Sequence, residues 1–198
     1  MEYLTSLFVF TFVACITPGP NNILLFTSSI NHGIRKTVPA YFGVCLGFVL
    51  LVAAVGFGLG ALFQQSPLLH RMLQIVGSCY LVYLAWKIAG ASAAKAAANK
   101  SKPVSFTEAA LLQWVNVKAW VAAIGAISAF TIETRIISSI AAIIAMYFFM
   151  SFCTMAMWVF TGARLQRFLH NDRRRRVFNV AMAGLLLVSI GPIMVNLM

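Results

Sequence analysis

Six long apolar segments dominate this chain of 198 residues and constrain its fold more than any other feature. Each segment is long enough for a membrane-spanning helix, which needs about 20 predominantly apolar residues. The segments are continuously apolar and do not alternate in two-residue steps, which excludes a β-barrel and leaves helices. They lie at Leu4–Ile30, Val38–Phe63, Leu68–Ala89, Glu108–Phe130, Ile136–Gly162 and Val177–Leu197. The sequence therefore predicts an all-α polytopic membrane protein with six transmembrane helices.

The composition agrees with this class. Hydrophobic residues make up 61% of the chain and charged residues 10%, whereas a soluble domain carries roughly 25% charged residues. So little polar surface excludes a soluble globular domain, and so much apolar surface excludes disorder. Six spans of about 23 residues use roughly 140 positions, which leaves no room for a large extramembrane domain. We therefore expect one transmembrane domain over residues 1–198.

The basic residues predict how the helices are oriented. The chain has 15 Lys and Arg against 4 Asp and Glu. Twelve of the basic residues lie in or beside the loops that follow the first, third and fifth spans. By the positive-inside rule these loops are cytoplasmic, which places both termini outside, in the periplasm of a bacterial inner membrane. Topology thus accounts for the positive charge, and we expect no binding to nucleic acid.

The first span is expected to be retained and not cleaved as a signal peptide. The chain begins Met-Glu-Tyr and has no basic region before the apolar stretch. The stretch also continues well past a Pro-Gly-Pro sequence, farther than the short apolar core of a signal peptide.

A loop rich in Ala, Lys and Ser divides the six spans into two groups of three. An odd number of spans per half makes the halves enter the membrane in opposite senses, as in the inverted repeats of many secondary transporters. We predict a first three-helix repeat at 1–90, a cytoplasmic linker at 91–107 and a second three-helix repeat at 108–198. Both repeats begin with an interrupted span.

The first span is interrupted by six residues: Thr17, Pro18, Gly19, Pro20, Asn21 and Asn22. The two prolines lack an N–H group and free the carbonyls of Ala14 and Ile16. Glycine between them adds backbone freedom, so we expect the helix to unwind here. In lipid the freed groups need partners, which places this stretch against protein or a watery cavity. Both asparagines then supply donors and acceptors near the middle of the bilayer, which favours a binding site over a simple proline kink.

The fourth span carries Gln113, Asn116 and Lys118. Lys118 is the only charged residue deep in a predicted span, and its burial costs about 3 kcal/mol on insertion scales, so we expect it to serve function. At about 100° per residue, Gln113 and Asn116 share a helix face, but Lys118 lies about 200° from Asn116. A straight helix cannot direct all three side chains into one cavity. We therefore predict a local break near residues 115–118.

These features suit a zwitterionic substrate such as an amino acid. The half-helix that begins near Asn21 offers free N–H groups and a positive dipole end to a carboxylate. Lys118 could add positive charge to that contact. The carbonyls at the end of the preceding half-helix could accept from an ammonium group. The candidate substrate-binding residues are Thr17, Pro18, Gly19, Pro20, Asn21, Asn22, Gln113, Asn116 and Lys118.

Pro18-Gly19-Pro20 in the first span and Asn116-x-Lys118 in the fourth resemble the two motifs of the LysE/RhtB family of bacterial amino-acid exporters. The length and the six-span pattern also agree. Three segments resemble the branch that exports cysteine and O-acetylserine: Thr17–Leu24, Leu84–Ala89 and Gln113–Lys118. The resemblance implies efflux of these compounds or close analogues across the inner membrane, driven by the proton gradient.

Two positions depart from the wider family. Many members have Asp where this chain has Asn21, and many have Pro where it has Val117. Both departures are shared with the cysteine-exporting branch. Without an acid at position 21, Lys118 is the one titratable group deep in the bundle. A lysine that is neutral in one state of the cycle could carry the coupling proton.

Other interpretations were weighed against export of cysteine. Another neutral amino acid, such as homoserine, threonine or leucine, is the serious alternative, because the motifs mark the backbone cradle and not the side-chain pocket. An intramembrane enzyme is a distant one, because the spans hold no paired acids, H-E-x-x-H or G-x-S-x-G. The four cysteines form no close pair and predict no disulfide or metal site. No cofactor is expected, and Gly43-x-x-x-Gly47 fits packing within the monomer or a homodimer seam.

Overall fold

The computed structural model describes residues 2–90, 102–166 and 172–188, and this part of the chain is helical with short connections and no strand. The elements are α1 (Glu2–Ile16), α2 (Pro20–His32), α3 (Ile34–Ala54), η1 (Val55–Leu59), α4 (Gly60–Gln65), α5 (Pro67–Gly90), α6 (Phe106–Val115), α7 (Val117–Phe130), η3 (Glu133–Arg135), α8 (Ile136–Gln166) and α9 (Asp172–Val188). Residues 91–101 of the predicted linker and 189–197 of the predicted sixth span lie outside the described residues.

The expected all-α fold is confirmed, whereas the full set of six spans stays a prediction. Two helical stretches are long and apolar enough to cross a membrane, Ile34–Leu59 and Glu133–Gln166. Two more spans arise if each bent pair counts as one, α1 with α2 and α6 with α7. The third predicted span coincides with α5, which at 24 residues has the necessary length. Its mean hydropathy is lower, because polar and basic residues interrupt its first turns.

Helix α2 is the interior element of the bundle. It packs against α8 and α3 on two sides and against α9 and α5 on the others. Nine of its 13 residues are buried, polar ones included. Its buried hydroxyls have partners: Thr27 Oγ1 donates to the carbonyl of Ile23 at 2.6 Å, and Ser28 bonds the hydroxyl of Thr37 in α3 at 3.0 Å. The N-terminal end of α2 therefore lies in the middle of the protein, where a polar site can be enclosed.

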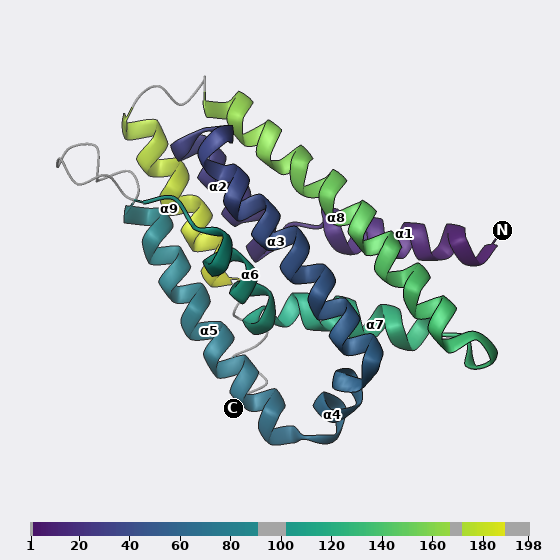
Figure 1. Cartoon of the computed structure of the whole chain (residues 1–198). Coiled ribbons are helices and arrows are strands. Elements are labelled where there is room, and N and C mark those ends of the chain that lie inside the picture. The colour runs from purple at the N-terminus through teal and green to yellow at the C-terminus, as the bar shows by residue number, and fades with distance from the viewer. Residues whose placement is uncertain (1, 91–101, 167–171, 189–198) are drawn as a thin grey trace.

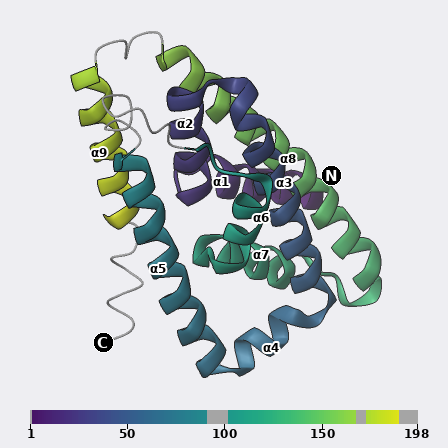
Figure 2. The same ribbon diagram turned by 60° about the vertical axis from the view of Figure 1, so that its left-hand side comes forward.

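Helices α5 and α9 lie side by side along one edge, whereas α1 and α7 extend toward the opposite edge (Figures 1 and 2). Between these edges α3 packs closely on α6. A Cβ at Gly43 would stand 2.3 Å from the backbone oxygen of Phe106, and one at Gly47 would stand 2.8 Å from Cα of Ala110. This glycine pair therefore serves packing within the monomer, as one of the two sequence interpretations held.

The helix ends that carry most basic residues gather at one end of the molecule. In Figure 1 the turn between α2 and α3, the end of α5, the start of α6, the end of α8 and the start of α9 all lie toward the upper left. The connection from α3 through α4 to α5 lies at the opposite end. The described basic residues thus have the one-sided distribution that the positive-inside argument uses. Lys95, Lys100 and Arg167, which the same argument counts, lie outside the described residues.

Candidate functional site

The Pro-Gly-Pro sequence breaks the first predicted span. Helix α1 ends at Ile16, α2 begins at Pro20, and the two axes differ by 53°. Proline suits the first position of α2 because the N–H group missing there has no partner within a helix. The first backbone bond of the new helix runs from the N–H of Ile23 to the oxygen of Gly19 at 3.0 Å. The predicted unwinding is therefore confirmed.

Asn22 holds the two halves of this span together. Its Nδ2 donates to the carbonyl of Cys15 at 3.0 Å and lies 3.5 Å from that of Ile16. Asn22 is 2% exposed, and its hydrogen bond to the Cys15 carbonyl is shielded from solvent. A carbonyl released by the break would otherwise remain unpaired in an apolar surrounding. Asn22 thus acts as a side-chain cap for the C-terminal end of α1.

The fourth predicted span is also broken, at Asn116. This residue has extended backbone angles, φ −86° and ψ 99°, and the axes of α6 and α7 differ by 63°. Its Oδ1 accepts from the N–H of Lys118 at 3.2 Å, and its backbone oxygen accepts from the N–H of Ala119 at 2.9 Å. Asn116 therefore supplies a side-chain N-cap for α7. The break predicted near residues 115–118 is confirmed, and no proline at 117 is needed for it.

Amide side chains join the two breaks. Asn21 Nδ2 donates to Gln113 Oε1 at 2.8 Å, and Gln113 Nε2 donates back to Asn21 Oδ1 at 3.0 Å. Asn116 Nδ2 donates to the same Asn21 oxygen at 3.2 Å. Gln113 and Asn116 are 0% and 2% exposed. This buried amide network fixes the start of α2 against the junction of α6 and α7.

Lys118 reaches back across the first break. Its Nζ donates to the carbonyl of Thr17 and, at 3.3 Å, to that of Pro18. Its side chain passes over Gly19, where an added Cβ would stand 2.8 Å from Cδ and 3.0 Å from Nζ of the lysine. The φ of Gly19, −169°, is extended. This position needs glycine for space and not for conformation.

A small cavity of about 30 Å³ lies where the two breaks meet. That volume holds roughly two water molecules. Its lining comes from five helices and both breaks: Ala14, Cys15, Gly19, Pro20, Asn21, Asn22, Val44, Phe48, Asn116, Lys118, Ala119, Ala122, Ser151 and Met155. A larger groove of about 730 Å³ between α1 and α7 shares Ala14, Lys118 and Ala122 with it. The lysine thus stands where the enclosed cavity meets the groove.

Comparison with known proteins identifies the family. The family described as LysE type translocator matches residues 12–196. The chain belongs to this family. It is 32% identical over 188 residues to the cysteine/O-acetylserine efflux protein of Escherichia coli O139:H28 (strain E24377A / ETEC), covering 93% of each chain. It is also 32% identical over 187 residues to the proteins of that name from Escherichia coli (strain K12) and Shigella flexneri serotype 5b (strain 8401), covering 92% of this chain and 93% of each relative. No solved structure matches the chain.

The resemblance drawn from the motifs is thereby confirmed, and this LysE type translocator is a membrane transporter and not an enzyme. Among the predicted site residues, Gly19, Pro20, Asn21, Asn22, Asn116 and Lys118 line the cavity. Gln113 lies behind it, bonded to Asn21. Thr17 and Pro18 are exposed and face the lysine through their carbonyls.

Several lining residues of the translocator were not predicted from the sequence. Cys15, which was assigned to no site from the sequence, lines the cavity at the end of α1. Ser151 and Met155 come from α8, and Phe48 from α3. A polar residue within an apolar span is the only sequence signal that could have indicated Ser151. Its exposed fraction of 1% shows that it faces the protein interior.

Proposed function

We propose that this translocator exports small neutral amino acids of the cysteine and O-acetylserine class from the cytoplasm. The observation that carries the proposal is the meeting of two broken spans at one cavity. Each break supplies backbone groups that a continuous helix would have used itself. Broken helices of this kind form the substrate sites of many secondary transporters.

The groups at the cavity match the two charges of a zwitterion. The first turn of α2, at Asn21 and Asn22, has backbone N–H groups with no partner within the helix and the positive end of the helix dipole. These suit a carboxylate. Beside the cavity, the break that follows α1 presents the carbonyls of Thr17 and Pro18 to the lysine, and these suit an ammonium. The side chains of Gln113 and Asn116 both bond that of Asn21 and hold this geometry.

The conformation fits a state closed to the cytoplasm. The groove between α1 and α7 adjoins the cavity on the side of the N-terminus, which the charge distribution places outside. On the other side, Leu24, Leu84 and Leu112 are at most 1% exposed and fill the interior beside α2. The cavity of about 30 Å³ is smaller than an amino acid, so substrate binding must enlarge it.

The helix contacts support the proposed inverted repeat. The long helix α3 of the first half packs on α6 and α7, the bent span of the second half. The long helix α8 of the second half packs on α1 and α2, the bent span of the first. The last helices of the two halves, α5 and α9, pack on each other. Such an exchange of equivalent partners is what a twofold relation between the repeats produces.

The energy source is proposed to be the proton gradient, with Lys118 as the group that binds the proton in one state. A homodimer stays a prediction. Location in a bacterial inner membrane with both termini outside completes the proposal.

Uptake into everted inner-membrane vesicles tests the function, because export appears there as uptake. Vesicles containing the protein should accumulate labelled cysteine and O-acetylserine when energised, and a protonophore should abolish the accumulation. Stronger competition by homoserine, threonine or leucine than by unlabelled cysteine would reassign the substrate to one of those amino acids. Accumulation that persists after collapse of the pH gradient would contradict proton coupling.

The part played by Lys118 has its own test. Lys118→Ala protein, present in the vesicles at the wild-type amount, should lose uptake. Lys87→Met removes another partly buried lysine, at the end of α5 and away from the cavity, and serves as the matched control. Uptake unchanged by Lys118→Ala would remove the lysine from the mechanism while leaving the substrate assignment open.

A further inference from the structure

The carbonyl end of α1 already holds a primary ammonium group, that of Lys118. Its Nζ donates to the backbone oxygens of Thr17 and Pro18. This is the negative end of a helix dipole, where a cation is stabilised. The contact therefore shows which chemical group these two carbonyls can accept, namely a primary ammonium.

Among the described side chains, no acid lines the cavity beside the lysine. The acids whose side chains the structure describes are Glu2, Glu108 and Glu133, and none of these three lines the cavity. Glu108 is paired with Lys87 at 3.0 Å. The Lys118 ammonium instead donates to the backbone carbonyls of Thr17 and Pro18, just after α1.

We propose that Lys118 is a tethered competitor of the substrate's own ammonium group, an inference that rests on the proposed function. A primary ammonium on a substrate and the ammonium of Lys118 cannot occupy the same two carbonyls. Two like charges about 4 Å apart also repel strongly in a medium of low dielectric constant. Substrate binding therefore requires Lys118 to leave the end of α1, and the return of the lysine expels the substrate amine.

Gly19 leaves room for the side chain of Lys118 to move. The side chain of Lys118 lies directly over this residue, which stands between the carbonyls of α1 and the first turn of α2. With no Cβ beneath it, the flexible stem can swing toward the start of α2. There the ammonium meets the place proposed for the substrate carboxylate. The lysine thus exchanges a contact with backbone oxygens for one with the substrate.

Occupation of the two carbonyls by Lys118 lowers the affinity of the protein for amines in the conformation described. When only a fraction of the molecules can bind, the apparent affinity falls by that fraction. Here the competent form is the one in which Lys118 has left the carbonyls. In a state that opens to the outside, weak binding favours release of exported substrate and disfavours its rebinding.

Cysteamine, which is cysteine without the carboxylate, isolates the effect. If Lys118 contacted only the substrate carboxylate, its removal would not change the affinity for cysteamine, which has no carboxylate. The Lys118→Met and Lys118→Ala proteins are purified into lipid nanodiscs with reductant, and their cysteamine affinity is measured by titration calorimetry. We expect both to bind cysteamine about tenfold more tightly than wild type. A tenfold gain follows if the Lys118 ammonium occupies the two carbonyls in about nine wild-type molecules of ten. Lys118→Arg keeps a tethered cation and should bind as weakly as wild type.

Two controls separate this effect from altered folding. Lys87→Met should leave cysteamine affinity unchanged, because its ammonium pairs with Glu108. The amine-free analogue 3-mercaptopropionate should gain no affinity from either Lys118 substitution. Cysteamine binding that is unchanged or weaker in monodisperse Lys118→Met and Lys118→Ala proteins would overturn the proposal. Failure of the proposed function would appear separately, as absence of cysteine uptake by wild-type vesicles.

Discussion

Asn21 and Gln113 bond each other through both amide groups, although 92 residues separate them in the sequence. The two distances, 2.8 and 3.0 Å, are those of well-formed hydrogen bonds. The pair ties the start of α2 to the end of α6, and Asn116 adds a third amide to the same oxygen. The two breaks are therefore one structural unit, and a change at either should affect both.

Gln113→Ala should destabilise the protein and impair uptake. It leaves Nδ2 of Asn21 without its acceptor, which costs about 1–3 kcal/mol, while Asn116 still donates to Oδ1 of Asn21. We expect a lower thermal unfolding midpoint in detergent and reduced vesicle uptake per molecule. Gln65→Ala, at an exposed position at the end of α4, is the control and should change neither quantity. Equal behaviour of the two variants would show that the amide pair does not hold the site.

Asn22→Asp should be more damaging than Asn22→Ala. Alanine removes the donor to the carbonyl of Cys15, at a cost of about 1–3 kcal/mol for the unpaired group. Aspartate removes the donor and also places a carboxylate against that oxygen. The thermal unfolding midpoint should therefore be highest for wild type, lower for Asn22→Ala and lowest for Asn22→Asp. An aspartate variant as stable as the alanine variant would contradict the capping role.

Gly19→Ala should impair uptake with little loss of stability. Alanine adopts the extended backbone of this position without strain, but its Cβ would stand 2.8 Å from Cδ of Lys118. The flexible end of the lysine must then move away from the carbonyls. We expect vesicle uptake to fall several-fold while the unfolding midpoint stays close to wild type. Gly184→Ala in α9, where a new Cβ meets no atom within 4 Å, is the control.

The breaks could be predicted from the sequence because they follow from local chemistry. Consecutive helix breakers predict the first, and the second follows from the angle between Asn116 and Lys118 around a helix. The partners of the side chains could not be predicted. That Asn22 caps α1 depends on how two half-helices fold back on each other. The contact from Lys118 to the Thr17 carbonyl depends on the packing of α7 beside that break.

Tertiary packing also decides which residues of intact spans reach the cavity. Ser151 and Met155 line the cavity because α8 packs against α1 and α2. Hydropathy alone does not distinguish them from neighbours that face the membrane. The same holds for Asn179, which is fully buried in α9 and bonds Asn31 across 148 residues of sequence. Pairings of this kind follow from the fold and not from any local pattern.

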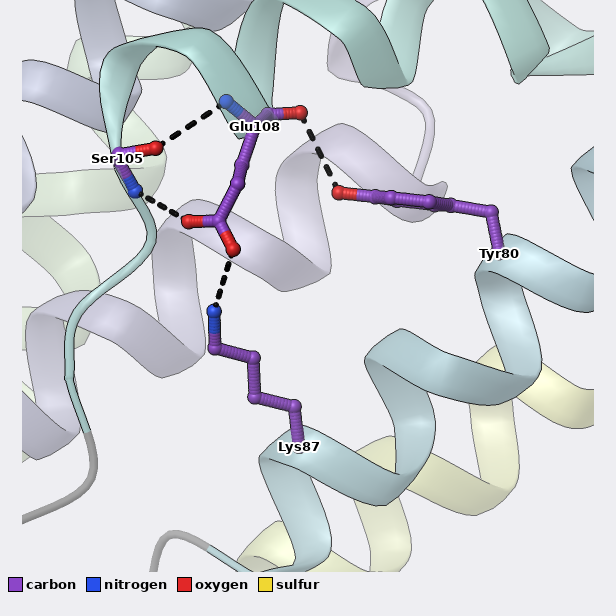
Figure 3. Close-up of polar contacts among 4 residues, drawn as sticks. All are labelled: Tyr80, Lys87, Ser105 and Glu108. Atoms are coloured by element: carbon purple, nitrogen blue, oxygen red, sulfur yellow. Dashed lines mark hydrogen bonds and ion pairs between the residues drawn. The ribbon is translucent and has the colours of Figure 1, made fainter.

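Glu108 has two separable roles at the start of α6 (Figure 3). Its carboxylate accepts from the N–H of Ser105 at 2.8 Å, as one half of a capping box, and from Lys87 at 3.0 Å. Glu108→Gln keeps the capping geometry and loses only a partly exposed ion pair, worth about 0.2–1 kcal/mol. Glu108→Ala also loses the cap contact, worth about 0.5–2 kcal/mol. Thermal unfolding should rank alanine below glutamine, and an equal effect of both would show that the cap contributes nothing.

The amide pair of Asn31 and Asn179 should stabilise the end of the bundle that we propose to be cytoplasmic and closed. Nδ2 of each residue donates to Oδ1 of the other at 3.2 Å, which joins the end of α2 to α9. Either single alanine substitution leaves one amide without a partner and should lower the free energy of unfolding by about 1–3 kcal/mol. The double substitution leaves no unpaired amide, so its effect should be smaller than the sum of the two single effects. Thermal unfolding of the four proteins measures this coupling. Strict additivity would mean that the two amides do not act as a pair.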